Sequence, residues 1–371
     1  MSDSLKEIAK ISFKLGCIGF GGIAGMISTI EKELVVKRKW IDHQHFMDVL
    51  SASYIIPGPN SVEIMMHCGK ERGGRAGLIT AGICYILPAT LICLVFAFFY
   101  KQYSALPNVQ RFISGIRPAT TALVIGTLFR LSGTLKKSYW LIGLCILVFI
   151  GGLAGISEIL LILGAGIVNC LFHSSRDRIR SVVLAPFLPL FVQDGSNFTL
   201  GKLFLIFLKI GAILYGSGYV LFAYMDADLV QRNHWLTRQQ LMDAIAVGQL
   251  TPGPILSSAT FAGYLVSGVS GGVLATTAIF LPSFFISLFL HRLLSYARRS
   301  KTLRLFLDGL SAASIAVIAI VGVNLTRTTL GDWRNSFILL LCLCLTLFVK
   351  KITTVAVIII GAACGYLLTF Y

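Results

Sequence analysis

The chain contains 371 residues, of which 56% are hydrophobic and 13% charged, and its mean hydropathy is +0.82. A soluble domain carries about 25% charged residues, so the composition excludes an ordinary soluble protein. It predicts an all-α polytopic membrane protein. Most of the formal net charge of +16 is explained by Lys and Arg in cytoplasmic loops, and the remainder favours an anionic solute.

Signatures of soluble chemistry are missing from the sequence. It contains no P-loop, no dinucleotide-binding fingerprint, no HExxH motif and no nucleophile elbow. Its nine cysteines are scattered, without a CxxC pair or a Cys/His cluster at zinc spacing. We therefore expect no enzyme, no catalytic residues, no cofactor, no metal site and no nucleic-acid partner.

The first half consists of apolar segments joined by charged loops. Five segments are expected to span the membrane, namely residues 7–30, 76–100, 109–131, 139–156 and 158–173. The segment 43–70 is too polar for an ordinary span, and it contains the motif Pro57-Gly58-Pro59. Because proline lacks an N–H group and blocks the preceding helical turn, we expect a broken or re-entrant element here.

The second half repeats this order after a basic linker. Its expected spans are residues 201–225, 271–291, 305–327, 336–349 and 352–371, and its broken element is residues 243–266. We therefore divide the chain into a first repeat (1–175), a cytoplasmic linker (176–200) and a second repeat (201–371).

The two repeats are related by sequence. Pro57-Gly58-Pro59 returns as Pro252-Gly253-Pro254, 195 residues later, and thirteen positions of residues 14–59 match at this offset. An odd number of spans in each half inverts the second copy relative to the first. The predicted fold is thus two homologous halves in an inverted repeat, with about 10 transmembrane helices plus two broken or re-entrant Pro-Gly-Pro elements.

Each Pro-Gly-Pro motif is expected to open a new half-helix, at Pro59 and at Pro254, since proline suits a first helical turn. The N-terminus of a helix offers free N–H groups and partial positive charge to an anion. Asn60 and Ser61 add donors in the first half, as Thr251 does in the second. The alternative for each motif is a simple structural kink.

Lys14 and Lys209 are equivalent residues inside apolar segments. A lysine near the bilayer centre costs about 2.5–3.5 kcal/mol on insertion scales, which a dianion held between the two amines would offset. Snorkelling of the long side chains to the interface is the alternative. The glycine runs at 19–22 and 216–218 are expected either to let helices pack closely or to unwind beside the substrate path.

Three further polar side chains are candidates. Arg117 lies inside an expected span, where it would contact substrate or pair with a carboxylate such as Glu63. Glu63 and His67 are four residues apart on one helical face, so they could relay protons. The candidate substrate-binding residues are Lys14, Gly21, Gly22, Pro59, Asn60, Ser61, Glu63, His67, Arg117, Lys209, Gly216, Gly218, Thr251, Gly253 and Pro254.

At these residues the chain resembles the chromate ion transporter family in its long two-domain form. The stretches that carry the resemblance are FGGIAGMI (20–27), PGPNSVEIMMHCGKERGGRAG (57–77), GIRPA (115–119), GSGYVLFAYMDADLVQRNHWLT (216–237), DAIAVGQLTPGP (243–254) and ATFAGYLVSGVSGGVLATTAIFLPSF (259–284). The first family motif often continues FGGP and then His, whereas this chain has Ile23, Ala24 and Gly25.

The resemblance implies a multi-pass protein of the plasma (inner) membrane that exports chromate and confers resistance. We expect a secondary transporter of a tetrahedral oxyanion, driven by the membrane potential or an ion gradient. Its partners would be the anion and the lipid bilayer, and a homodimer is compatible with the sequence without being required by it. The alternatives are a transporter of another oxyanion such as sulfate, and an intramembrane enzyme or sensor.

Overall fold

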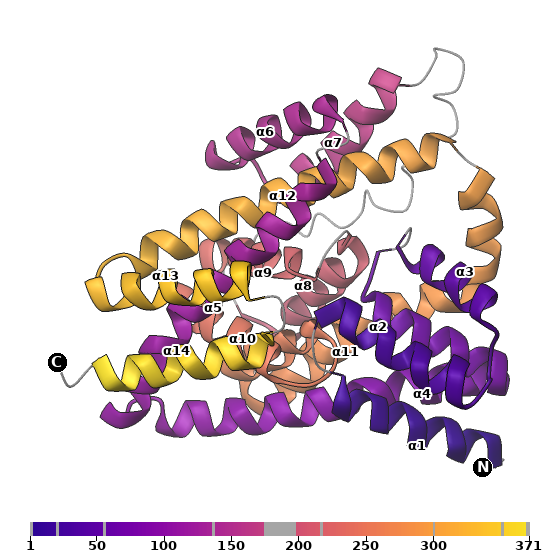
Figure 1. Cartoon of the computed structure of the whole chain (residues 1–371), viewed down its shortest axis with the longest axis horizontal. Coiled ribbons are helices and arrows are strands. Elements are labelled where there is room, and N and C mark those ends of the chain that lie inside the picture. The colour runs from indigo at the N-terminus through magenta and orange to yellow at the C-terminus, as the bar shows by residue number, and fades with distance from the viewer. Residues whose placement is uncertain are drawn as a thin grey trace.

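The computed structural model describes residues 3–19, 22–54, 57–135, 138–173, 198–215, 218–299, 301–349 and 352–368, and these contain helices but no strand (Figure 1). Gly21, Gly216 and most of the expected linker lie outside the described residues. The first-half elements are α1 (Asp3–Ile18), α2 (Gly22–Glu31), η1 (Lys32–Lys37), α3 (His43–Ser53), α4 (Asn60–Tyr103), α5 (Pro107–Leu135), α6 (Tyr139–Leu153) and α7 (Glu158–His173). The second-half elements are α8 (Leu200–Ile213), α9 (Val220–Met225), η4 (Asp226–Arg232), α10 (Arg238–Leu250), η5 (Ile255–Ser257), α11 (Ser258–Arg299), α12 (Lys301–Thr329), α13 (Trp333–Phe348) and α14 (Thr354–Leu368).

The first apolar segment of each half folds back on itself. The Nζ of Lys14 lies 3.1 Å from a carboxylate oxygen of Glu33, and a guanidinium nitrogen of Arg38 lies 3.1 Å from a carboxylate oxygen of Glu7. These contacts join the first helix to the end of the same segment, in reverse order along the chain, so the segment is an antiparallel hairpin. The expected span over residues 7–30 is therefore two short helices, α1 and α2.

The long helix α4 is also folded back, at Gly73 and Gly74. Gly74 has φ +60°, which favours glycine. A Cβ placed on Gly69 would lie 2.5 Å from the Cβ of Ala81, whereas twelve residues of straight helix would separate them by about 18 Å. The element is thus a short arm, residues 60–72, followed by a long helix, residues 75–103.

The second half repeats this fold-back at Ser267 and Gly268, whose φ values of −142° and +65° match the −141° and +60° of Gly73 and Gly74. Gly263 and Gly271 meet here as Gly69 and Gly77 meet in α4. The sequence duplication therefore extends to individual backbone angles. Both Pro-Gly-Pro elements are re-entrant hairpins, as the sequence predicted.

Four described helices are long and apolar enough to cross a membrane: Asn60–Tyr103, Pro107–Gly133, Ile255–Leu288 and Thr302–Thr329. Four shorter apolar helices accompany them, namely α6, α7, α13 and α14. The fold is that of a polytopic helical membrane protein with two homologous halves, as predicted. The expected number of about ten spans is not confirmed, since the opening segment of each half turns back.

The two halves interlock. The helices α4 and α11 pack on each other, while α13 and α14 of the second half pack on α5 of the first. In return α6 and α7 of the first half pack on α12 of the second, along which they run in Figure 1. This exchange buries apolar faces between the halves, so the corners near the centre of the bundle are held by both copies.

Candidate substrate cavity

Each Pro-Gly-Pro corner forms a backbone hydrogen bond with the other half of the chain. The N–H of Gly58 donates to the carbonyl oxygen of Leu214 at 2.8 Å, and the N–H of Gly253 donates to the carbonyl oxygen of Gly19 at 2.9 Å. These two bonds are equivalent, since each joins a corner glycine to the end of the first helix of the opposite half. Gly58 and Gly253 have φ values of +141° and +95°, which explains why glycine stands between the prolines.

A helix begins at each corner, as the sequence predicted. Pro59 is the N-cap of α4, and its carbonyl oxygen accepts from the N–H groups of Val62 and Glu63 at 2.8 and 3.2 Å. Pro254 is the N-cap of the 3₁₀ turn η5 that leads into α11, and its carbonyl oxygen accepts from Ser257 at 3.0 Å. The first N–H groups of such a helix have no acceptor within the helix and can bind a ligand.

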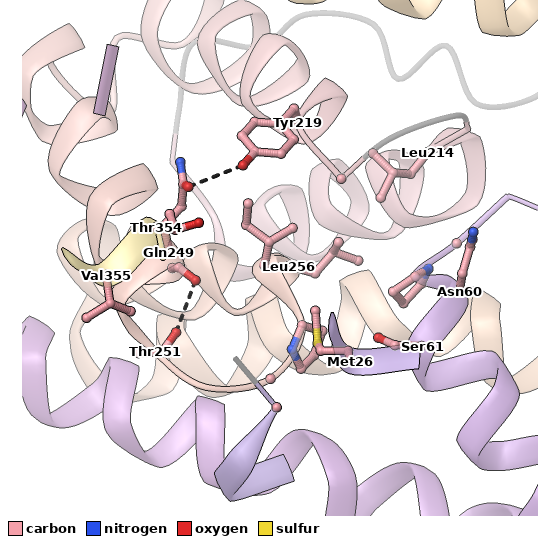
Figure 2. A pocket seen from close by; sticks show the side chains of 18 of the residues that line it. Met26, Asn60, Ser61, Leu214, Tyr219, Gln249, Thr251, Leu256, Thr354 and Val355 are labelled. Carbon is pink, nitrogen blue, oxygen red and sulfur yellow. Dashed lines mark hydrogen bonds between the residues drawn. The ribbon is translucent and has the colours of Figure 1, made fainter. Parts of the chain in front are cut away.

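A cavity of about 90 Å³ lies between the two corners. It is large enough for several water molecules. Figure 2 shows Asn60 and Ser61 on one side of it and Tyr219, Gln249 and Thr251 on the other. None of the described residues that line it is charged. The cavity therefore offers a solute neutral dipoles from both halves.

The candidate residues divide into those that line this cavity and those that do not. Asn60, Ser61 and Thr251 line it, as do the corner residues Pro59, Gly253 and Pro254 and the backbone at Gly218. Gly22 begins α2, and Gly19 of the same run lines the cavity. The lining residues do not include Lys14, Lys209, Glu63, His67 or Arg117.

The two lysines have carboxylate partners that sequence reasoning missed. Lys14 pairs with Glu33 and Lys209 pairs with Asp228. Glu33 and Asp228 are separated by the same 195 residues as the lysines, so the ion pair itself is duplicated. A search for conserved spacing of opposite charges, as well as for identical residues, would have found it. The expected cost of burying the amines is thus offset by carboxylates, and a bound dianion is not needed for that purpose.

Both carboxylates lie in matching π-helical turns, η1 and η4. π-Turns are rare and occur often at functional positions. Glu33, which lies outside the spanning helices, also receives hydrogen bonds from Lys37 and Arg38. Burial opposes its ionisation, but the bonds from Lys14, Lys37 and Arg38 prevail and lower the pKa of Glu33 to about 2.

Arg117 is paired across the halves. Its Nε and a terminal nitrogen donate to the two carboxylate oxygens of Asp243 at 3.0 and 2.9 Å, and the hydroxyl of Tyr100 donates to the same carboxylate at 2.7 Å. The expected carboxylate partner exists, but it is Asp243 on α10 and not Glu63. Asp243 therefore holds α5 and α10 together.

Glu63 lies directly behind the first corner. Its side chain is fully buried, and a Cβ on Gly58 would collide with its carboxyl oxygen and lie 2.8 Å from the Oγ of Ser283. Neither carboxyl oxygen has a hydrogen-bond partner among the residues that the structure describes. Burying a charge without a partner is costly, so such a group favours its neutral form. His67, one helical turn further along the arm, is also buried.

Duplicated halves, re-entrant hairpins and a cavity between them define a multi-pass membrane protein with the architecture of a transporter. The sequence model described as chromate transporter matches residues 6–170 and 201–366, one match for each half. The chain belongs to the chromate transporter family.

Relatives of similar length support this assignment. A probable chromate transport protein of Synechococcus elongatus is 27% identical over 98% of this chain and 95% of its own length. A chromate transport protein of Cupriavidus metallidurans is 26% identical over 97% of this chain and 92% of its own length. An uncharacterized transporter of Methanocaldococcus jannaschii is also 26% identical, over 96% of this chain and 92% of its own. No solved structure matches the chain significantly.

Proposed function

We propose that this protein is a secondary transporter that exports chromate across the plasma membrane and thereby confers chromate resistance. The observation that carries the proposal is the cavity between the two Pro-Gly-Pro corners, which is lined by equivalent elements of both halves. The two halves would be inverted relative to each other. The reciprocal bonds of Gly58 and Gly253 support a two-fold relation between them.

The cavity suits a tetrahedral oxyanion. Two helix starts, at Pro59 and Pro254, present N–H groups and partial positive charge from different directions. The side chains of Asn60, Ser61 and Thr251 add donors. Neutral dipoles can hold an anion without binding it as tightly as a fixed cation would, which lets the solute leave again.

The charged candidates take other places in this proposal. Lys14 and Lys209 would raise the local anion concentration near the re-entrant hairpins through their field. Arg117 would hold the α5–α10 contact beside the cavity, and Glu63, one helical turn from His67, would respond to the arriving anion by changing protonation.

Energetics favour export. Moving two negative charges outward across about 100 mV, inside negative, releases roughly 4–5 kcal/mol. That free energy sustains about a thousandfold gradient without ATP. Uptake of the same dianion would require coupled cations.

The test is chromate flux in liposomes that contain the purified protein, with the membrane potential set by a potassium gradient. We expect chromate to move toward the positive side, faster as the potential grows. Asn60→Ala combined with Thr251→Ala should reduce this flux, while Asn324→Ala, a polar change in α12 away from the lining residues, should not. Sulfate, molybdate and phosphate as competitors would identify another natural oxyanion. A folded protein that moves no oxyanion would contradict transport and favour an intramembrane enzyme or sensor.

A further inference from the structure

A second cluster of chemically active side chains lies at the other end of the arm of α4. It consists of His45 on α3 and of His67 and Glu71 on the arm. The Nε2 atoms of His67 and His45 lie 3.4 and 3.6 Å from the same carboxylate oxygen of Glu71. One candidate ligand atom from each side chain lies within 4.8 Å of the others. The transport proposal assigns no role to this group as a unit.

These separations fit a bridging ion better than direct hydrogen bonds. A hydrogen bond between nitrogen and oxygen has a length of about 2.7–3.2 Å, so both contacts are too long. Two ligands at about 2.0–2.2 Å from a tetrahedral zinc ion lie roughly 3.3–3.6 Å apart. The Nε2 of His45 is enclosed and has no hydrogen-bond partner among the described residues. An ion between the three side chains would satisfy it.

The cluster also has an open side. His45 and Glu71 line a cleft of about 650 Å³ together with Asp42 and His43. The side chain of Glu71 is 44% exposed, whereas that of His67 is 3% exposed. An ion could therefore enter from the cleft and keep a water molecule as its fourth ligand. Two imidazoles and one carboxylate form a ligand set that zinc accepts in this way.

The position of the cluster gives it a mechanical consequence. The helix α3 leads into the first Pro-Gly-Pro corner and the arm of α4 leads out of it, so the two helices are the legs of one hairpin. His45 lies near the start of α3, and Glu71 lies near the end of the arm. An ion there would join the two legs at the end opposite the corner that forms the cavity.

The second half lacks these ligands. The positions equivalent to His45, His67 and Glu71 are Gln240, Phe261 and Leu265. The cluster is therefore not a requirement of the duplicated fold, which forms its second hairpin without it.

We propose that His45, His67 and Glu71 bind one first-row divalent transition-metal cation, with Zn²⁺ the best fitted, and that the ion clamps the hairpin around the first corner. Imidazole nitrogen suits zinc and its neighbours in the first row, whereas magnesium and calcium favour oxygen ligands. No sequence motif indicates the site, because its ligands come from two helices separated by the Pro-Gly-Pro motif.

The experiment titrates the purified full-length protein, stripped with a chelator, with Co²⁺ and then with Zn²⁺. Co²⁺ absorption in the visible region reports its coordination, and displacement by Zn²⁺ reports affinity. We expect one ion per chain in the wild type. His45→Ala and Glu71→Gln, which change partly exposed residues, should each weaken binding more than about 100-fold, since even changes outside the ligand set weaken metal sites 10–100-fold.

His43→Ala is the matched control, because His43 lies two residues away on α3 and pairs with Glu31 outside the cluster. It should retain wild-type affinity. Zn²⁺ should also raise the melting temperature of the wild type and of His43→Ala, but not of Glu71→Gln. Binding that is absent from the wild type, or equal in Glu71→Gln and the wild type, overturns the proposal. Neither result depends on anion flux, so the proposed transport is tested separately.

Discussion

In both halves an ion pair between a lysine of the first helix and a carboxylate of the π-helical turn closes the first segment, but the two ion pairs differ in exposure. In the first half Lys14 is 50% exposed and shares Glu33 with Lys37 and Arg38. In the second half Lys209 is 9% exposed, and its partner Asp228 is 5% exposed. The lysine–carboxylate ion pair is thus present in an exposed form in one half and in a buried form in the other. This indicates that its common role is to hold the first helix of each half against the π-helical turn.

The two corners differ in a second way. Behind Gly58 lies the carboxyl group of Glu63, whereas Gly253 lies against Ala89, whose Cβ would be 3.2 Å from an added one. The position that matches Glu63 is Ser257 in η5, which bonds with Thr251 at 3.3 Å. One corner therefore has an acid behind it and the other a pair of hydroxyl groups. The backbone of the two corners is duplicated, and the corners differ in single side chains.

The largest expected effect on stability distinguishes the ion pair of Lys209 from that of Lys14. Lys209→Ala should lower the free energy of unfolding by about 3–5 kcal/mol, because it leaves the buried Asp228 without its partner. Lys14→Ala should lower it by less than about 1 kcal/mol, as for exposed ion pairs. Thermal unfolding of the detergent-purified proteins measures both. Equal effects of the two variants would contradict the comparison.

The double variant Lys209→Met with Asp228→Leu sharpens this result. An apolar pair can replace a buried ion pair with little loss of stability, so the double variant should fold. If it also transports chromate, Lys209 acts as an anchor alone. If it folds but does not transport, the amine acts on the anion as well.

The bridge between α5 and α10 is not duplicated, because Ser311 of the second half stands at the position equivalent to Arg117. Arg117→Ala should destabilise the protein by about 2–3 kcal/mol, since Asp243 is 4% exposed but Arg117 is 26% exposed. Arg111→Ala, a change of a half-exposed residue on the same helix, is the control and should have little effect. Wild-type melting of Arg117→Ala would show that the bridge is dispensable.

Replacement of the two corner glycines should destabilise the protein to different extents. Gly58→Ala and Gly253→Ala both place a Cβ at positive φ, which costs about 1–3 kcal/mol. Gly58→Ala should be the more damaging, because the new methyl group meets Glu63 and Ser283. The melting temperature and the chromate flux of both variants check this prediction. A larger loss in Gly253→Ala than in Gly58→Ala would contradict it.

Glu63→Gln tests the acid behind the first corner. The amide has the same shape, and the carboxyl group favours its neutral form, so the free energy of unfolding should change by less than about 1 kcal/mol. If Glu63 takes up a proton during transport, the variant should lose the pH dependence of flux. A large drop in stability would indicate that the group is ionised and paired.

The last expected effect appears only at acidic pH. The pKa of Glu33 falls from 4.5 to about 2 in the folded protein, so its contribution to stability is complete above about pH 4.5. That contribution is lost as the pH falls toward 2, where the folded carboxylate binds a proton. Glu33→Gln should remove this part of the acid dependence, which melting curves between these pH values would reveal.

Local stereochemistry made much of the fold predictable. The duplication, the helix starts at Pro59 and Pro254 and the re-entrant corners follow from glycine and proline, whose backbone preferences need no distant partner. The family follows from the same motifs. The span count was less certain, because apolar composition does not distinguish a helix that crosses from a segment that turns back at glycines.

Only the tertiary structure decided which side chains meet. The partner of Arg117 lies 126 residues away on α10, the acid behind Gly58 faces a serine of the other half, and His45 joins His67 and Glu71 across a corner. Ion pairs and metal sites depend on distances of a few ångströms between atoms far apart in the chain. The sequence by itself therefore determined where the backbone bends, and packing of the interlocked halves determined what lies at each bend.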